Sequence, residues 1–197
     1  MNSCLNFRPR QQGSSLIEVL VTLIILLLGL LGLVGLMVQG QRSQMESYQR
    51  VQALVVLQDM VNRINTNRKA AACYAITTDA TSGTPYLGTG YTGTPVCSTG
   101  TAAQQARAMS DLTEWSSVLQ GSAELSGTAN VGAMLGARGC VSVATVGTFQ
   151  VYTVTVVWQG SGKTLAPPST LPCATGLFGD EAQRRAVSAP LQIASLS

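Results

Sequence analysis

Few side chains in this sequence of 197 residues could do chemistry. It contains no histidine, which excludes Ser-His-Asp and Cys-His catalytic arrangements, histidine metal ligands and a histidine general base. Its two lysines, Lys69 and Lys163, do not lie in a Ser-x-x-Lys pattern. We therefore expect no enzyme, no catalytic residue, no bound metal or cofactor and no small-molecule substrate, with carboxylate-only chemistry as the one formal option left.

Glu18 is the most unusual of the charged residues. It lies at the start of an apolar run, because residues 19–38 carry no charge and only one hydroxyl group, that of Thr22. As a helix rising about 1.5 Å per residue, this run would span roughly 30 Å, the thickness of the hydrocarbon core of a bilayer. A carboxylate at that depth costs free energy unless something uses it, which makes Glu18 a candidate functional residue.

The five cysteines divide into one and four. Cys4 precedes the apolar run, and Cys73, Cys97, Cys140 and Cys173 follow it. An even number of cysteines in a domain expected outside the cytoplasm predicts two disulfides, for which three pairings are possible. We favour Cys73–Cys97 with Cys140–Cys173, because each bridge joins neighbours in the sequence. No Cys-x-x-Cys pair exists, so the spacing does not fit a zinc site.

The segment before the apolar run predicts how the chain is oriented and processed. Arg8 and Arg10 should keep the N-terminus in the cytoplasm by the positive-inside rule, so that everything after residue 39 lies outside. A secretory signal has an apolar core of about 7–15 residues followed by small residues at the cleavage site. Here the core is longer, and the small residues Gly13, Ser14 and Ser15 come before it. This order favours cleavage on the cytoplasmic side, with the apolar helix retained.

The stretch GSSLIEVL, residues 13–20, closely resembles the class III signal of type IV pilins and pseudopilins. The resemblance implies that prepilin peptidase cleaves between Gly13 and Ser14, that residues 1–13 are a leader peptide, and that the new amine of Ser14 is N-methylated. Glu18 then becomes the fifth mature residue, where the family carries its glutamate, and its implied role is subunit assembly. Ser14 departs from the usual phenylalanine. In an apolar filament core, the carboxylate of one subunit could neutralise the terminal ammonium of its neighbour.

Glycines recur in and just after the apolar run, at positions 29, 32, 35 and 40. Each costs a helix interior up to about 1 kcal/mol relative to alanine. Two interpretations stay open: close packing against other helices in the membrane, or a segment that unwinds when it moves from membrane to filament.

Two amphipathic helices are predicted beyond the membrane. The first helix should continue through residues 41–68, which contain neither glycine nor proline, with ion pairs Glu46–Arg50 and Asp59–Arg63. Residues 77–101 are rich in threonine and glycine and predict a long loop. A second helix should span residues 102–119, and we expect its Trp115 to be buried. The faces that should pack in the core are Ala53, Leu57, Met60 and Ile64 in the first helix, and Ala108, Leu112, Trp115 and Leu119 in the second.

Strands are predicted in the last third of the chain. Residues 139–146 and 149–158 flank a tight turn at Gly147-Thr148, which indicates a hairpin. A last strand is expected over residues 186–194, where Pro190 indicates an edge strand or a bulge. Asp111 and Glu114 are too isolated in the sequence to be interpreted as a catalytic pair.

Two further segments resemble minor pilins of the PilV type: DLTEWSSVL at residues 111–119 and FQVYTVTVVWQG at residues 149–160. The resemblance implies an α+β pilin fold, a long N-terminal helix packed on a small antiparallel sheet. It implies a leader at residues 1–13, a transmembrane and filament-core half-helix at 14–38, and a periplasmic or extracellular globular domain at 39–197. The chain would reside in the inner membrane and then in the pilus at the cell surface, with prepilin peptidase, other minor pilins and the major pilin as partners.

The expected function is that of a minor pilin that joins a priming or tip complex and promotes pilus assembly, adhesion or twitching motility. One alternative is a minor pseudopilin of a type II secretion system, which shares the N-terminus and most of the fold. Another is a DNA- or surface-binding tip module, and a third is a membrane-anchored enzyme, against which the missing histidines count. A net charge of +3 does not indicate the basic face that duplex binding usually needs, so nucleic acid is not an expected partner.

Overall fold

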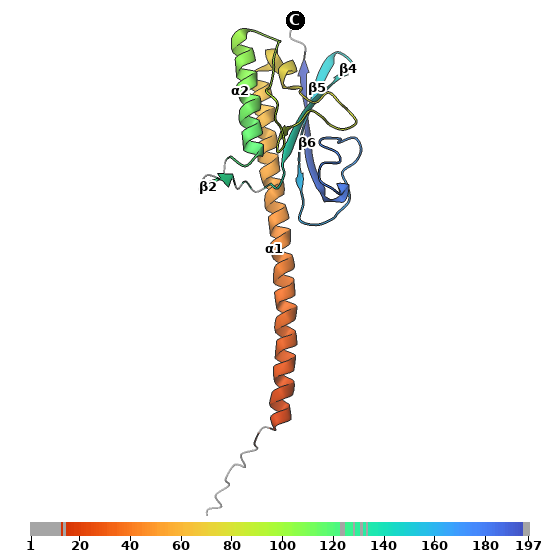
Figure 1. Ribbon diagram of the computed structural model, residues 1–197. Helices are drawn as coiled ribbons and strands as arrows, with labels where there is room; N and C mark the ends of the chain where they lie inside the picture. Colours follow the sequence, from red (N-terminus) through yellow and green to blue (C-terminus); the bar gives the residue numbers. More distant parts are fainter. Residues whose placement is uncertain are drawn as a thin grey trace, which may run out of the picture. The chain divides into compact units, whose positions relative to one another are not determined.

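The computed structural model describes residues 13, 15–122, 125–127, 129–130, 132 and 134–194. The chain divides into two compact units, Met1–Ser43 and Gln44–Ser197, and each is described by itself. One continuous helix, α1 (Leu16–Thr66, 51 residues), begins in the first unit and ends in the second (Figure 1).

In the first unit α1 is apolar on every side. Its large hydrophobic side chains are all exposed, from 88% for Leu16 to 45% for Val38. The helix is unbroken at its four glycines, and nothing lies within 4 Å of the point where a Cβ would be added to any of them. Exposing so many apolar side chains to water costs free energy, so this unit needs an apolar environment, either lipid or other helices.

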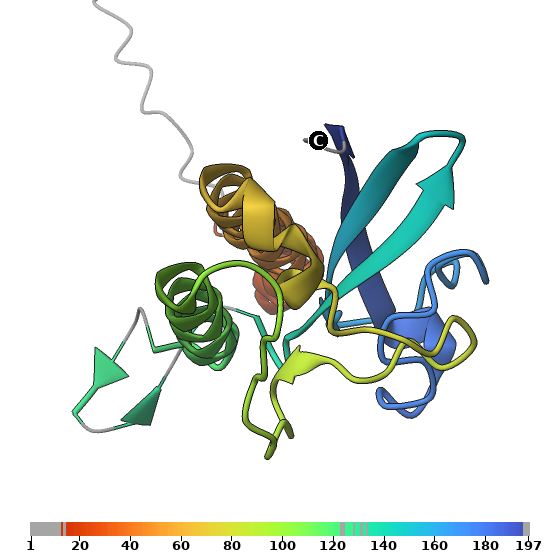
Figure 2. The same cartoon turned by 90° about the horizontal axis from the view of Figure 1, so that it is seen from above.

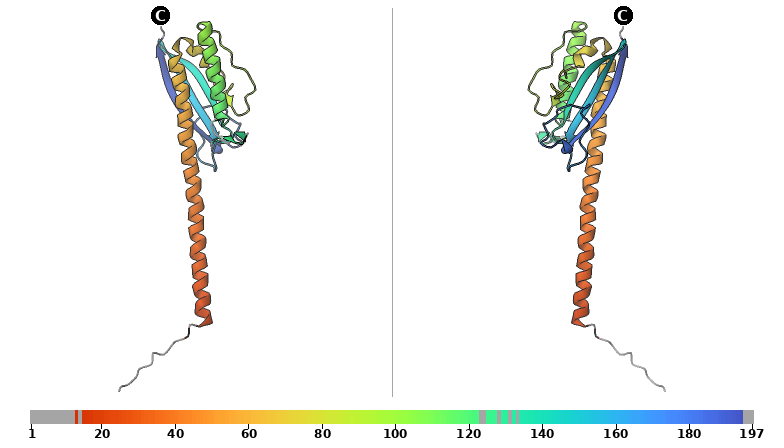
Figure 3. Two further views of the ribbon diagram at one scale, coloured as in Figure 1. Left: turned by 90° about the vertical axis from the view of Figure 1, so that its left-hand side faces the viewer. Right: turned by 90° about the vertical axis from the view of Figure 1, so that its right-hand side faces the viewer.

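The second unit has a four-stranded antiparallel sheet in the order β1 (Leu87–Gly88), β4 (Arg138–Val146), β5 (Phe149–Gln159), β6 (Arg184–Ala194). Figures 2 and 3 show the three long strands alongside the C-terminal part of α1, with helix α2 (Ala102–Leu119) next to α1. The predicted α+β architecture is therefore confirmed. After α1 the elements are η1 (Arg68–Tyr74), β1 (Leu87–Gly88), α2 (Ala102–Leu119), β2 (Leu125–Ser126), β3 (Ala129–Asn130), β4 (Arg138–Val146), β5 (Phe149–Gln159), η2 (Glu181–Gln183) and β6 (Arg184–Ala194).

The core of this unit lies where α1, α2 and the sheet meet. Trp115 is fully buried there, as predicted, and its Nε1 donates a hydrogen bond to the carbonyl of Val56 at 2.9 Å. Gly139 makes room for the Trp115 ring, because a Cβ at that position would overlap it. All eight residues predicted for the two helix faces are buried: Ala53, Leu57, Met60 and Ile64 from α1, and Ala108, Leu112, Trp115 and Leu119 from α2.

Most elements lie close to their predicted bounds. Helix α2 spans the predicted residues, and the hairpin turn between β4 and β5 has Gly147 at a φ of 62°, a conformation that favours glycine. Strand β6 begins at Arg184, two residues earlier than expected, and is an edge strand with Pro190 opposite Thr153. Helix α1 ends at Thr66, after which the 3-10 helix η1 continues the chain.

Two sequence expectations need correction. The segment 77–101 is not wholly a loop, because β1 pairs with β4 and Leu87 is fully buried. Glu46 accepts a hydrogen bond from Arg185 of β6 at 3.2 Å, where the sequence predicted Arg50 as its partner. Both differences come from contacts between residues far apart in the chain, which the local pattern does not contain.

Both disulfides are present, in the pairing that joins sequence neighbours. Cys73–Cys97 ties η1 to the segment before α2, with a Cα–Cα distance of 5.0 Å. Cys140–Cys173 ties β4 to the loop before β6, with a Cα–Cα distance of 5.8 Å.

Candidate functional site

The start of α1 contains the residues that the sequence singled out for processing and assembly. Ser15 caps the helix: the backbone N–H of Glu18 lies 3.3 Å from the Ser15 hydroxyl and 3.0 Å from its carbonyl. Glu18 lies in the first turn, where a carboxylate interacts favourably with the helix dipole. The spacing Ser15-x-x-Glu18 is that of a capping box, a local signal that was in the sequence and that we did not use.

The expected cleavage point lies just before this cap. Gly13 is exposed, and nothing lies within 4 Å of the point where its Cβ would be added. The fold of this chain therefore does not require a glycine there, and any such requirement would come from a processing enzyme. Ser14, the expected site of cleavage and N-methylation, lies outside the described residues, as do residues 1–12 with Arg8 and Arg10.

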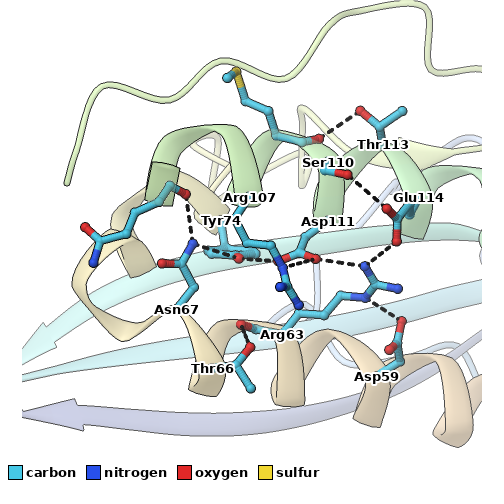
Figure 4. A network of polar contacts seen from close by, with 12 residues as sticks. Asp59, Arg63, Thr66, Asn67, Tyr74, Arg107, Ser110, Asp111, Thr113 and Glu114 are labelled. Carbon is cyan, nitrogen blue, oxygen red and sulfur yellow. Dashed lines mark hydrogen bonds and ion pairs between the residues drawn. The ribbon is translucent and has the colours of Figure 1, made fainter. Parts of the chain in front are cut away.

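A second group of charged residues lies between α1 and α2 in the second unit (Figure 4). The Arg63 guanidinium donates from Nε to Asp59, the predicted partner, at 2.9 Å. Its Nη1 donates to both Asp111 and Glu114 of α2, again at 2.9 Å each. The two carboxylates that looked isolated in the sequence therefore meet at one guanidinium.

Asp111 is the centre of this network, with 3% of its side chain exposed. Its Oδ2 accepts a hydrogen bond of 2.6 Å from the Tyr74 hydroxyl, and its Oδ1 accepts bonds from Arg63 and from Arg107 at 3.3 Å. Asn67 in turn donates to the Tyr74 hydroxyl at 3.2 Å. Both oxygens of this buried carboxylate therefore accept hydrogen bonds, which offsets the cost of burying its charge.

The contacts of the network shift the pKa values of three of its groups. Burial and the hydrogen bond to Asp111 raise the pKa of Tyr74 well above its ordinary value, so the phenol stays a donor. Burial would lower the pKa of Arg63, but its carboxylate partners raise it overall. The hydrogen bond from Arg63 lowers the pKa of Glu114. These shifts favour the charged forms of Arg63 and Glu114 and the neutral form of Tyr74, and the hydrogen bonds of Arg63 indicate a structural tie between α1 and α2.

Within the described residues, no group of three or more His, Cys, Asp or Glu side chains could hold a metal ion. One described helix, α1, is long and apolar enough to cross a membrane, with a mean hydropathy of 3.0 in its most apolar window.

Comparison with known proteins bears on the N-terminal segment. A model of the prokaryotic N-terminal methylation motif matches residues 8–34, which include Gly13, Ser14, Glu18 and most of the apolar run. Residues 8–34 therefore carry the methylation motif that type IV pilins and pseudopilins share. Neither a curated protein nor a solved structure matches it.

The motif bears on how the N-terminal segment is processed and where the globular unit lies. The methylation motif implies processing by prepilin peptidase. The pilin-type apolar helix, together with the two disulfides, indicates a membrane-anchored protein whose globular domain lies outside the cytoplasm. Pilin-family proteins are typically structural and not enzymatic.

Proposed function

We propose that this pilin-family chain is a minor type IV pilin of the PilV type, which joins a priming or tip complex and promotes pilus assembly, adhesion or twitching motility. The observation that carries the proposal is the placement of Glu18. It lies five residues after Gly13, in the first turn of a 51-residue helix whose apolar half exposes all of its large hydrophobic side chains.

The proposed mechanism follows from that placement. Prepilin peptidase cleaves between Gly13 and Ser14, which removes residues 1–13 and leaves an amine at Ser14 that is then methylated. The segment 14–38 anchors the subunit in the inner membrane and later lies in the filament core. There the Glu18 carboxylate neutralises the terminal ammonium of a neighbouring subunit, because neither charge is stable alone in an apolar core.

The assignment to the minor pilins is supported by the two segments that resemble the PilV type. They fall on the second half of α2 and on β5, two elements that contribute to the core of the globular unit. A minor pseudopilin of a type II secretion system is the alternative with the same N-terminus. A strain lacking the gene separates the two, since loss of piliation supports the proposal and loss of protein secretion with normal pili supports the alternative.

The decisive test compares two substitutions of Glu18. Glu18→Ala removes the carboxylate and the capping-box side chain, whereas Glu18→Gln removes only the charge, because glutamine also serves in a capping box. We expect both variants to be processed, with the mass of residues 1–13 lost and one methyl gained. We expect sheared pili to contain each variant at about one tenth of the wild-type amount or less, because one ion pair in the apolar core is lost.

The glutamine variant decides between the two roles of the side chain. If Glu18→Gln enters pili normally while Glu18→Ala does not, the carboxylate serves only to start the helix, and the proposed pairing is wrong. An intact N-terminus on wild-type protein in cells with active prepilin peptidase would remove the basis of the proposal altogether.

A further inference from the structure

A cavity of about 470 Å³ lies beside the Cys73–Cys97 disulfide, wholly within the globular unit. One side is formed by the end of η1 and the residues just after it, and the other by the segment 91–99 that leads to α2. Its size falls in the range of pockets that hold small organic ligands.

The side chains that line the cavity carry no charge. Ala72, Ala75 and Ile76 give it an apolar floor, and the half-buried ring of Tyr91 lines it from the opposite segment. Hydroxyl groups come from residues 94, 98 and 99. An ion of either sign would lose its hydration here without a charged partner, which excludes strongly charged ligands.

The wall also offers backbone groups that the protein does not use. Within the described part of the chain, residues 92–98 neither donate nor accept a hydrogen bond through the backbone. A purely hydrocarbon ligand would cover these N–H and C=O groups and leave them unpaired, at a cost for each. The fitting ligand is therefore neutral, rich in hydrogen-bonding groups, and apolar on one face.

The wall is held in place before any ligand arrives. The disulfide fixes Cys97 to the end of η1, and Pro95 is buried. Gly93 lies against the ring of Tyr91, since a Cβ there would come within 2.8 Å of the phenol oxygen. Such preorganisation lowers the entropic cost of binding.

We propose that this cavity binds a neutral saccharide unit. A pyranose presents hydroxyl groups that both donate and accept, which match the free backbone groups of residues 92–98. Its axial C–H bonds form an apolar face that can stack on the Tyr91 ring. The site does not depend on Glu18 or on processing, so it stands whether the chain serves a pilus or a secretion system.

The test uses the full chain in lipid nanodiscs and saturation-transfer NMR. The probes are the methyl glycosides of glucose, galactose and N-acetylglucosamine, with glucuronate as the charged counterpart of glucose. We expect saturation transfer to at least one neutral glycoside and binding of glucuronate weaker by about tenfold or more, because its charge finds no partner.

Three variants locate the binding. Tyr91→Ala should weaken binding about tenfold through the lost ring contact. Tyr86 is also half-buried but does not line the cavity, so Tyr86→Ala should leave binding unchanged. Ser98→Trp changes an exposed lining position and should block the cavity without removing a core contact.

Three outcomes would overturn the proposal. The first is no saturation transfer to any neutral glycoside, and the second is equal binding in wild type and Ser98→Trp. The third is tighter binding of a capped valine peptide than of every glycoside, which would assign the cavity to a peptide. A melting curve that matches the wild type shows that Tyr91→Ala is folded and that its binding can be compared. If the curves differ, the binding of Ser98→Trp decides whether the ligand occupies the cavity.

Discussion

The two disulfides close loops of similar length in very different surroundings. Cys140 and Cys173 are 3% and 2% exposed and pack in a small core with Val157, Ala174 and Phe178. Cys73 is 8% exposed, whereas Cys97 is only half-buried and lines the cavity. Cys140–Cys173 is therefore an interior bridge, whereas Cys73–Cys97 lines the cavity.

The segments around Cys173 and Cys97 also differ in how many hydrogen bonds hold them. The guanidinium of buried Arg184 donates to the carbonyls of Leu171 at 2.7 Å and of Cys173 at 3.3 Å. Further along the same loop, Ala174 and Thr175 donate to the carbonyls of Gly83 and Ser82. The segment 92–98 has no such backbone hydrogen bonds to other described residues.

This difference teaches that loop length does not decide what a disulfide contributes. The sequence separations are 24 and 33 residues, so closing either loop should cost the unfolded chain about 3.5 kcal/mol of entropy. Whatever distinguishes the two bridges therefore lies in the folded state. Opening the exposed one lets its loop regain freedom, but opening the buried one disturbs a packed core.

The largest expected effect is removal of the buried bridge. The double substitution Cys140→Ala and Cys173→Ala should lower the free energy of unfolding by about 4 kcal/mol, the loop-closure contribution together with lost packing. Denaturant unfolding of the purified chain in detergent can be followed by the fluorescence of Trp115 and Trp158, both buried in the globular unit. A loss below that of the Cys73–Cys97 double variant would reverse the comparison.

Removal of the side chain that anchors the buried loop should come next. Arg184→Met should destabilise the chain by about 2–3 kcal/mol, because Glu181 and two carbonyls lose their buried donor. Lys163→Met is the matched control, since it breaks an ion pair with Asp180 that is open to solvent, and it should change stability little. Equal effects in the two variants would show that the buried contacts of Arg184 do not stabilise the loop.

The smallest effect on the fold should come from opening the exposed bridge. Under limited reduction by a phosphine, followed by alkylation, mass spectrometry should find Cys73 and Cys97 labelled first, because Cys97 is the more accessible. The partly reduced chain should keep its tryptophan fluorescence and lose about 1–2 kcal/mol of stability. In denaturant, where burial is lost, both bridges should react alike. Simultaneous labelling of all four cysteines in the native chain would contradict this order.

The elements that the sequence predicted well are those with a local pattern. Helix α2 has the predicted bounds because apolar residues recur on one face from Ala108 to Leu119, and the β4–β5 hairpin follows from its β-branched strands around Gly147. The processing motif is local too, and it was found from eight residues. The Ser15 cap was equally local, and we overlooked it.

What could not be predicted depends on residues far apart in the chain. Arg63 donates hydrogen bonds to Asp111 and Glu114, which are 48 and 51 residues away in the sequence. Arg185 donates to Glu46, which is 139 residues away. The two-residue strand β1 has no periodic pattern and exists because Leu87 fits the core. The cavity likewise arises from the meeting of two segments whose compositions, taken alone, predict only a helix end and a loop.

The position of Pro190 has a consequence for how copies of the chain can associate. Proline has no N–H to give to β5, so Thr153–Pro190 is a non-bonded pair of the ladder, and the nitrogen of Pro190 faces the open edge of the sheet. A strand from another molecule would find no donor there, and the opposite edge, β1, is only two residues long. Pro190 therefore weakens the β6 edge as a template for a strand from another molecule. In the filament proposed above, this proline would disfavour edge-to-edge pairing between the sheets of neighbouring subunits.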